Sequence, residues 1–377
     1  MIRFFVALGL LKWLQMLTRC VIISTVLIRR TSMSLRKNLV FTVIAAVSIL
    51  CGCADKTNND KNIAVTRDVF AMDTYMNLKA YGKNAEPALE EAEKRIHELE
   101  NELSATSEQS DIWKINHSSG EETAVSRDTA ALIDKALEIG NSTHGALDIT
   151  IFPVLKEWGF TTEKYHIPDE NKLKSLLENV DYMQIKLNDK TVSIPEKSEI
   201  DLGALAKGYT GDEIMEVFKS HSIDSAIVSL GGNVQALGSK PDGTNWKVAV
   251  RDPFSPENDM CVVEISDKAV ITSGNYERFF TGDDGERYWH IIDPADGYPA
   301  DTGFVSVTVI GENGLNCDCL STALFVVGID GYKDIMMDYP NYDFIFVTDD
   351  EKMLYTGGIK DKFQNISSMS AEVIDID

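Results

Sequence analysis

Basic side chains are scarce in this sequence. The chain of 377 residues has 36 Lys and Arg against 59 Asp and Glu. Seven of the basic residues and none of the acidic ones fall within residues 1–52, which leaves 29 basic and 59 acidic side chains and a net charge near −30 in the remainder. This charge excludes binding of nucleic acid or anionic lipid through a basic patch, because both require clustered positive charge.

Long apolar runs are also lacking. Leu39–Leu50 holds 12 residues, whereas a membrane-spanning helix needs about 20. This run follows the basic segment Met33–Lys37 and precedes Leu50-Cys51-Gly52-Cys53, the small-residue pattern found before a lipidated cysteine. We therefore interpret residues 1–52 as a signal region that ends in a lipobox, with translation starting at Met33, rather than as a transmembrane anchor.

The lipobox predicts where the mature protein resides. Lipid on Cys53 would hold it at the cell membrane on the extracytoplasmic side, as a lipid-anchored lipoprotein. Residues 53–64 would then form the lipidated N-terminus and a polar tether. The alternative is a genuine additional anchor within residues 1–32.

Cysteines are too few for a disulfide framework. Beyond the lipid site the mature chain has three, Cys261, Cys317 and Cys319, which is an odd number. The segment Cys317-Asp318-Cys319 lacks the other ligands of a zinc site. We interpret these thiols as small buried residues.

Apolar periodicity predicts helices before strands. Three helices are expected, over residues 86–103, 126–139 and 169–177, with Ser126 capping the second. Beyond residue 220 the pattern is mainly that of strands, with one late helix over 318–327, so the predicted fold class is α+β. Residues 65–362 are expected to form the catalytic domain, as one unit or two interleaved lobes, and residues 363–377 a C-terminal tail.

The stretch Asp201-Leu-Gly-Ala-Leu-Ala-Lys-Gly-Tyr209 joins a predicted strand, Val192–Ile200, to a predicted helix. Backbone N–H groups at a helix start favour anions, and Lys207 adds a positive charge. The stretch therefore predicts phosphate binding, although its spacing is not the GxxxxGK[ST] of a P-loop. The alternative is an ordinary turn with a surface lysine.

Two glycine turns resemble ligand-binding loops. Gly145-Ala146-Leu147-Asp148 places an acid beside a turn, and the alternative for Asp148 is a capping or solvated residue. Leu230-Gly-Gly-Asn233 ends a predicted strand in paired glycines, which permit close approach of a ligand or of another backbone. A plain tight turn is the alternative there.

Two later segments carry groups suited to catalysis. His290 lies in an apolar strand before Ile292, Asp293 and Pro294, where a lone histidine is more often structural. Asp318 and Thr322 are four residues apart at a predicted helix start, so their oxygens share one face. With phosphate oxygens or water they could hold Mg²⁺; the alternative for Asp318 is a helix N-cap.

Together these segments are more specific than any one of them. Their order along residues 65–360 resembles the signature of the ApbE family, the FAD:protein FMN transferases. The matching segments are Met72, Gly145–Asp148, Asp201–Tyr209, Leu230–Asn233, Ser273-Gly-Asn-Tyr276, His290–Pro294 and Asp318–Thr322. The resemblance implies an ApbE-like, T-fold-related mixed α/β architecture, and the lipobox fits because many members are bacterial lipoproteins.

The family resemblance also implies an activity. Members of the family use FAD and Mg²⁺ and move FMN onto a threonine of an acceptor protein, releasing AMP. The acceptor is typically a subunit of a membrane redox complex or a secreted flavoprotein. Positions that match FAD contacts are Met72, Ala146, Leu147, Asp148, Asp201, Lys207 and Ile292. Positions that match metal ligands are Ala204 through its carbonyl, Asp318 and Thr322, whereas Ser321 replaces an acid of some members and the family's aromatic residue near Leu103 is not recovered.

The implied chemistry requires a proton acceptor for the threonine hydroxyl. We take His290 as the catalytic base and Asp293 as the reserve candidate. Two other functions fit the same residues. One is a Mg²⁺-dependent FAD pyrophosphatase with water as the acceptor. The other is a non-catalytic flavin-binding or solute-binding lipoprotein, which has no need of the acid–threonine pair at 318 and 322.

Overall fold

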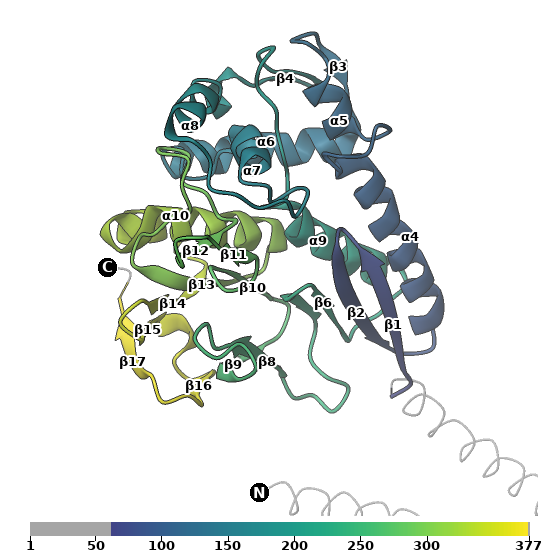
Figure 1. Ribbon diagram of the computed structural model, residues 1–377. Coiled ribbons are helices and arrows are strands. Elements are labelled where there is room, and N and C mark those ends of the chain that lie inside the picture. The colour runs from purple at the N-terminus through teal and green to yellow at the C-terminus, as the bar shows by residue number, and fades with distance from the viewer. Residues whose placement is uncertain (1–61, 376–377) are drawn as a thin grey trace, which may run out of the picture. The chain divides into compact units, whose positions relative to one another are not determined.

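A nine-stranded sheet organises the described part of the protein, residues 62–375 of a computed structural model (Figure 1). Its strand order is β1-β2-β6-β7-β10-β13-β14-β15-β17, antiparallel except for the last pair. The strands are β1 (Ala64–Ala71), β2 (Thr74–Tyr81), β6 (Ala226–Leu230), β7 (Asn233–Leu237), β10 (Ala269–Gly274), β13 (Phe304–Gly311), β14 (Asp343–Thr348), β15 (Lys352–Thr356) and β17 (Ser370–Ile374).

Three smaller sheets accompany it. One joins β16 (Phe363–Asn365), β9 (Asp259–Ile265) and β8 (Trp246–Arg251). A second joins β3 (Thr123–Ala124), β5 (Thr191–Ser193) and β4 (Lys186–Asn188), and a hairpin pairs β11 (Phe279–Thr281) with β12 (Arg287–Trp289). The first of these packs on the large sheet through a buried cluster that includes Val248, Met260, Ile310 and Ile345.

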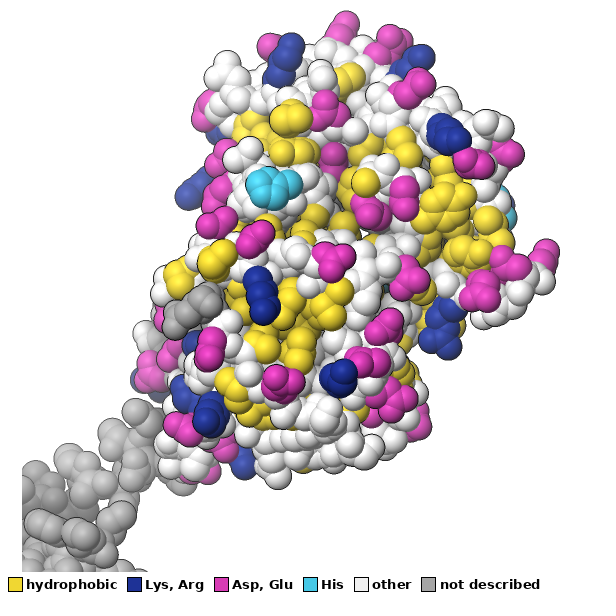
Figure 2. Space-filling model, turned by 90° about the vertical axis from the view of Figure 1, so that its left-hand side faces the viewer, with side chains coloured by type: hydrophobic (Ala, Val, Ile, Leu, Met, Phe, Trp, Pro, Cys, Tyr) yellow, Lys and Arg dark blue, Asp and Glu magenta, His cyan; other side chains and the backbone are white. Residues whose placement is uncertain are grey.

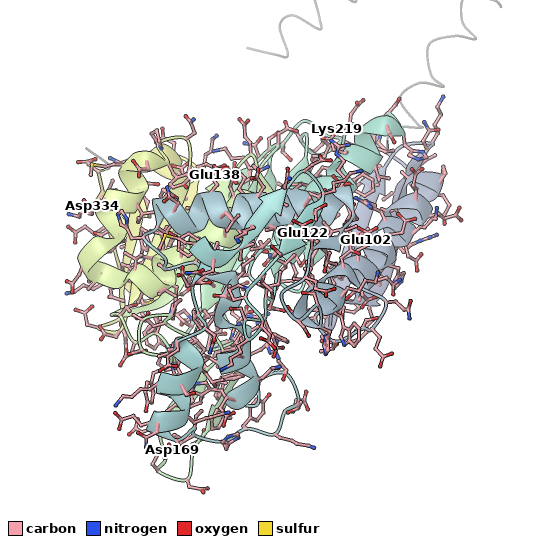
Figure 3. All side chains as sticks on the ribbon, turned by 90° about the horizontal axis from the view of Figure 1, so that it is seen from above. Glu102, Glu122, Glu138, Asp169, Lys219 and Asp334 are labelled. Carbon is pink, nitrogen blue, oxygen red and sulfur yellow. The ribbon has the colours of Figure 1, made fainter. Side chains whose placement is uncertain are left out.

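Helices cover the other face of the large sheet. The helices are α4 (Ala85–Leu103), α5 (Asp111–Asn116), α6 (Arg127–Ser142), α7 (Phe152–Glu157), α8 (Glu170–Leu177), α9 (Ala206–Ser220) and α10 (Gly314–Asp338), with short 3₁₀ turns η1 (Ile149–Ile151), η2 (Tyr182–Gln184) and η3 (Gly357–Ile359). Helices α4, α9 and α10 lie on the sheet, while α5–α8 form the upper part of Figure 1. Figure 3 shows Glu138 of α6, Lys219 of α9 and Asp334 of α10 spread along this layer.

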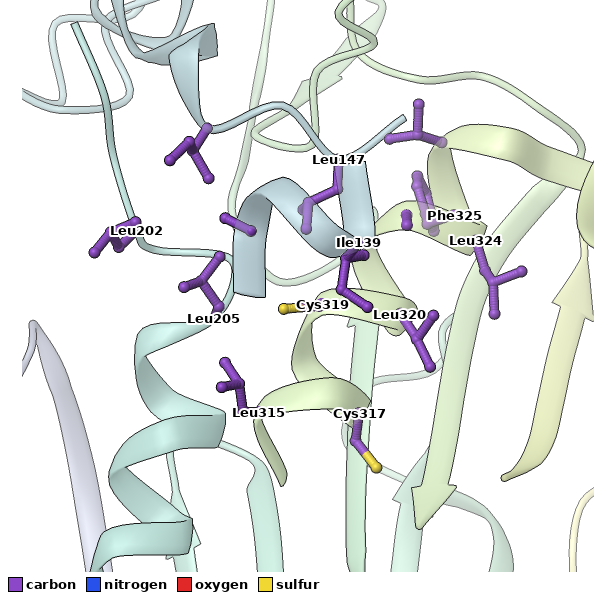
Figure 4. Packing of buried hydrophobic residues seen from close by; sticks show 14 of the residues in the cluster. Ile139, Leu147, Leu202, Leu205, Leu315, Cys317, Cys319, Leu320, Leu324 and Phe325 are labelled. Atoms are coloured by element: carbon purple, nitrogen blue, oxygen red, sulfur yellow. The ribbon is translucent and has the colours of Figure 1, made fainter. Parts of the chain in front are cut away.

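The helical layer and the sheet share one large core. Leu147, Leu202, Leu205 and Leu315 belong to it and are labelled in Figure 4. Because these leucines come from the loops and helix starts that carry the predicted site residues, burial of apolar side chains fixes the backbone around the site. The mixed α/β architecture agrees with the predicted fold class.

The predicted strand Val192–Ile200 is wrong in length. Pairing ends at Ser193, and residues 194–205 run as a loop before α9 begins at Ala206. Pro195 has no N–H for a ladder. Further along, the Asn116 side chain replaces a neighbouring strand, because its amide donates to the Ile200 carbonyl at 2.9 Å and its oxygen accepts the Ile200 N–H at 2.7 Å.

Other boundaries also differ from expectation. Ser126 does cap α6, accepting the Thr129 N–H at 3.0 Å, but the helix continues to Ser142. Residues 363–374, predicted to belong to a tail, pair as β16 with β9 and as β17 with β15. Helix α10 begins at Gly314 and kinks at Gly328, whose φ of 70° is open to glycine.

The signal region, the lipobox and Cys53 lie outside the described residues. Within residues 62–375, none of the helices combines the length and the apolar character that a membrane crossing requires. Acidic side chains outnumber Lys and Arg on the face drawn in Figure 2. Cys261, Cys317 and Cys319 are buried free thiols, as expected.

Candidate active site

Lys207 is the positive charge around which the predicted site assembles. It lies half-buried in the first turn of α9, and its ammonium makes no hydrogen bond or ion pair with any residue in the described range 62–375. Burial raises the pKa of three neighbouring carboxyl groups, and the Lys207 ammonium opposes each rise. These groups are Asp201, Glu277 and Asp318. A lysine free of protein partners at a helix start is suited to hold phosphate.

Asp318 lies in the second turn of α10, not at its start. Asn313 is the N-cap and accepts the Asn316 N–H at 2.8 Å, so the alternative that Asp318 caps the helix is wrong. The Asp318 carboxylate instead spans to α9 and β7. Its Oδ2 accepts the Gly208 N–H at 2.8 Å, and its Oδ1 accepts from the Asn233 amide at 3.0 Å.

Glycine at 208 makes this contact between helices possible. An added Cβ would lie 2.3 Å from the Gly314 carbonyl oxygen and 2.7 Å from the Cβ of Asp318, closer than such atoms can approach. The backbones of α9 and α10 therefore meet at Gly208 because it has no side chain. Sequence reasoning read this glycine only as part of a phosphate-binding turn.

The carbonyl of Ala204 lies just outside α9. The helix begins at Ala206 with Leu205 as its N-cap, so the Gly208 N–H is one of the donors at a helix start that have no partner within the helix, and it bonds to Asp318. No described residue donates a hydrogen bond to the Ala204 oxygen. A carbonyl oxygen without a donor is a ready ligand for a hard cation.

Thr322 completes the set of predicted metal ligands. It follows Asp318 by one helical turn, and its hydroxyl lies 3.2 Å from the Ser273 hydroxyl of β10. Ser321 donates to the Asp318 carbonyl at 2.9 Å and also contacts Ser273 at 2.8 Å, so its hydroxyl is already engaged. One carboxylate with neutral oxygens fits Mg²⁺, which takes its remaining ligands from substrate and water. In the described residues no cluster of three His, Cys, Asp or Glu could bind a metal.

Asp201 and Asp148 lie on adjoining loops. The Asp201 N–H donates to the Ile149 carbonyl at 2.9 Å, and its carboxylate accepts the Gly203 N–H at 2.8 Å. Asp148 accepts the N–H of Thr150 at 2.8 Å and of Tyr182 at 3.0 Å, so its capping alternative is confirmed. Burial raises the pKa of both carboxyl groups.

In the Gly145 turn, the side chains of Ala146 and Leu147 are small or buried, so they present little surface to a ligand. Leu147 is 3 % exposed and packs in the core, so a ligand could reach it only through its backbone. Ala146 is partly buried beside the same cluster. Leu103, near the expected aromatic position, is also a core residue.

Met72 lies in the turn of the β1–β2 hairpin. Met72 and Asp73 have φ of 51° and 55°, the mirror-image turn that glycine or asparagine usually occupies. The Met72 N–H donates to Glu100 at 2.7 Å, and its sulfur lies 3.7 Å from the Thr210 hydroxyl of α9. Met72 is therefore held one helical turn from Lys207, in a conformation that costs backbone energy.

His290 is neutral and oriented. Its Nδ1 lies 3.2 Å from the Arg278 carbonyl, and because a carbonyl only accepts, Nδ1 carries the proton and Nε2 keeps a lone pair. Burial, followed by the charges of Arg278 and Lys207, lowers the pKa of His290 to about 3. The ring is thus unprotonated at neutral pH and is a weak base.

Asp293 and Ile292 make contacts that hold the turn that follows them. The Asp293 carboxylate accepts the Ala295 N–H at 2.8 Å, and its own N–H donates to the Tyr298 carbonyl at 2.8 Å. Ile292 is 5 % exposed and bridges to Pro299. Unlike Asp201 and Asp318, Asp293 has no detectable interaction with Lys207, and its pKa is raised chiefly by burial.

Sequence reasoning missed Glu277 and Arg278. Glu277 has no hydrogen-bond or ion-pair partner among the described residues, and its Oε1 lies 3.8 Å from where a Cβ on Gly232 would stand. Arg278 donates to the Phe160 carbonyl at 2.7 Å and holds His290 through its own carbonyl. Both immediately follow the matched segment Ser273–Tyr276, which was the only signal for them.

Two surface hollows lie on the described part of the protein. One is lined by Arg127 and Lys190, and the other, lined by Asp212, Lys268 and Gln235, borders the junction of α9 and α10. Neither contains a predicted site residue. The charged groups around Lys207, rather than these hollows, therefore define the candidate site.

Fold and site together define a flavin-transferase-like class, and comparison with known proteins names the family. The family model for the ApbE family matches residues 72–346, and the chain belongs to that family. A Treponema pallidum protein called FAD:protein FMN transferase is 32% identical over 84% of this chain and 93% of its own length. A Vibrio cholerae protein of the same name is 32% identical over 63% of this chain and 72% of its own.

Solved structures agree with this assignment. The ApbE protein from Thermotoga maritima has a TM-score of 0.75 at 29% identity, covering 80% of this chain and 99% of that one. The flavin transferase ApbE from Vibrio cholerae has a TM-score of 0.72 at 27% identity, with coverage of 80% and 99%. The ApbE-like fold expected from the sequence is confirmed.

Proposed function

We propose that this protein is a Mg²⁺-dependent FAD:protein FMN transferase that moves FMN from FAD onto a threonine of an extracytoplasmic acceptor flavoprotein and releases AMP. The observation that carries the proposal is the junction of α9 and α10. There, Asp318 accepts the Gly208 N–H, and neither the Ala204 carbonyl nor the Lys207 ammonium has a hydrogen-bond partner among the described residues. A carboxylate, an open carbonyl and a free ammonium near the start of α9 suit the binding of a cation together with a phosphate.

Each group has a role in that reaction. Lys207 binds the pyrophosphate of FAD through its ammonium and its backbone N–H, because the N–H groups of Ala206 and Gly208 already donate to Leu202 and Asp318. Asp318, Thr322 and the Ala204 carbonyl would hold Mg²⁺, which supplies positive charge to the phosphate oxygens. Asp201, Asp148, Ala146, Leu147, Ile292 and Met72 are the remaining residues proposed to border FAD.

The proposed reaction forms one phosphorus–oxygen bond and breaks another. The threonine Oγ attacks the phosphorus of the FMN half, the bond from that phosphorus to the bridging oxygen breaks, and AMP leaves with that oxygen. His290 accepts the hydroxyl proton at Nε2, the nitrogen left free by the Arg278 carbonyl. Asp293 is the weaker candidate because its carboxylate is engaged in a turn.

The acceptor meets the enzyme outside the cytoplasm in this proposal. The signal region and lipobox support lipidation at Cys53 and anchoring to the cell membrane. A subunit of a membrane redox complex or a secreted flavoprotein would then be within reach. The net negative charge of the mature chain supports a protein acceptor rather than a nucleic acid.

An assay of AMP release tests the proposal against its two alternatives. The mature protein is incubated with FAD and Mg²⁺, with and without an acceptor domain that carries the target threonine. The proposal expects AMP to appear with the acceptor and to match the flavin bound to it covalently. Equal AMP release without an acceptor would make the protein an FAD pyrophosphatase. Flavin that binds without Mg²⁺ and is never cleaved would make it a flavin-binding lipoprotein.

A further inference from the structure

Two amide side chains of β7 reach the junction between α9 and α10. Asn233 and Gln235 are alternate residues of the strand, so they lie on the same face of the sheet, beneath the helices. Each is 4 % exposed. Buried amides on a strand are costly unless their hydrogen bonds are satisfied, so their partners indicate what the two residues do.

Asn233 acts on the carboxylate of Asp318. Its amide donates to Oδ1 at 3.0 Å, while the Gly208 N–H donates to Oδ2 at 2.8 Å. Each oxygen accepts one bond from the protein and keeps a further lone pair. The two donors fix the rotation of the carboxylate about its Cβ–Cγ bond without exhausting it as a ligand.

Gln235 acts on Gly208. Its Nε2 donates to the Gly208 carbonyl at 2.9 Å. The side chain is enclosed by three glycines, because an added Cβ on Gly211 or Gly314 would lie 2.3 or 1.7 Å from its Nε2. Gly208 is thus held at both polar groups, its N–H by Asp318 of α10 and its carbonyl by Gln235 of β7.

We propose that Asn233 and Gln235 form an amide pair that positions the proposed metal ligand Asp318. Asn233 orients the Asp318 carboxylate, and Gln235 holds Gly208 so that its N–H stays on the same carboxylate. Without the pair, the carboxylate loses one of its two donors, and the other is no longer held in place. Both act through other residues and are positioning residues. Their part in catalysis rests on the proposed function.

Binding of Mn²⁺, followed by the electron paramagnetic resonance signal of the free ion, tests the amide pair without any turnover. Asn233→Leu and Gln235→Met remove the amides at nearly constant volume. Loss of a residue that orients a metal ligand typically weakens metal binding by about 10- to 100-fold, and we expect this for both variants. Asn365→Leu is the matched control, because Asn365 also donates one amide bond, to the Met369 carbonyl at 2.8 Å, but from β16.

The outcomes separate this inference from the proposed function. Wild-type affinity for Mn²⁺ in both Asn233→Leu and Gln235→Met, or an equal loss in Asn365→Leu, would overturn the amide pair and leave the transferase proposal standing. Absence of Mn²⁺ binding by the wild-type protein would overturn both. Unfolding temperatures measured in EDTA identify a variant that fails to fold, and the remaining variant then decides the question.

Discussion

The Asp318 carboxylate accepts the backbone N–H of Gly208 at 2.8 Å, across 110 residues of sequence. This bond joins α10 to the first turn of α9 and fixes one oxygen of the proposed metal ligand Asp318. The Ala204 carbonyl, a second proposed ligand, lies just before that turn and has no donor among residues 62–375.

Replacing the carboxylate tests the metal site. Asp318→Asn keeps an oxygen that can accept from Gly208 but removes the negative charge. We expect kcat for FMN transfer to fall by at least about 100-fold, the scale on which single transition-state contacts act. Steady-state assays over a range of Mg²⁺ concentrations measure it, and an activity within threefold of wild type would remove Asp318 from the mechanism.

Gly208→Ala tests the close approach of the helices. The new Cβ would meet the Gly314 carbonyl at 2.3 Å, so α9 and α10 must separate. Overpacking of this kind costs about 1–3 kcal/mol, and we expect a loss of stability in that range. Gly357→Ala is the control, since its nearest neighbour would lie at 4.0 Å. Urea unfolding of the two variants compares them, and equal stability would contradict the packing described.

Lys207→Met tests the electrostatic link to His290. The charge of Lys207 is one of the causes that hold the pKa of His290 at about 3, after burial and Arg278. Removing a neighbouring positive charge favours the protonated ring, so the pKa of His290 should rise. Nuclear magnetic resonance titration of the imidazole measures it. An unchanged pKa would show that the two groups do not interact.

The raised pKa of Asp212 predicts that the free energy of unfolding depends on pH. Asp212 accepts the N–H groups of Gly314 at 2.8 Å and Leu315 at 2.9 Å, and burial raises its pKa from 3.8 to about 6. Because the folded state binds this proton more tightly than the unfolded state, its contribution to stability is present below pH 4 and is lost as the pH rises through about 6. Asp212→Asn should flatten that part of the curve. Unfolding measured from pH 4 to 7 decides it, and parallel curves for both proteins would refute the assignment.

Glu277→Gln tests whether Glu277, which was not predicted from the sequence, takes part in the site. Glu277 has no partner within the described residues, so its removal should leave the unfolding temperature nearly unchanged. A charged hydrogen bond to substrate contributes about 1.5–3 kcal/mol, and we expect transfer to slow by about tenfold or more. Glu277 is an exposed residue, and unchanged transfer would show that it takes no part in the site.

The sequence predicted correctly those structural features that depend on neighbouring residues of the chain. Helix α4 and the Ser126 cap follow from apolar spacing and a single side chain, and both are present. The same logic failed at Asp318, because a cap and an in-helix ligand look alike until Asn313 is seen to occupy the N-cap. Pairing of β16 and β17 depends on distant strands and has no local signature.

The same distinction between local and long-range determinants applies to the residues of the candidate site. Lys207, Asp201 and Asp318 could be named from their motifs, and the structure brings both carboxyl groups within reach of the Lys207 charge. The Ala204 carbonyl could be named only through the family resemblance, and the reason for Gly208 and the roles of Asn233 and Gln235 could not be predicted. Each depends on a contact between segments that are 27 to 110 residues apart.

The central claim is that this junction transfers FMN to a protein. Intact-mass spectrometry of a threonine-bearing acceptor domain, co-expressed with the wild-type chain or with Asp318→Asn, tests it most directly. The account predicts one FMN added to the acceptor, located on the threonine, with the wild-type chain, and an unmodified acceptor with Asp318→Asn. An acceptor that stays unmodified with the wild-type chain, or that is modified equally by both, would contradict it.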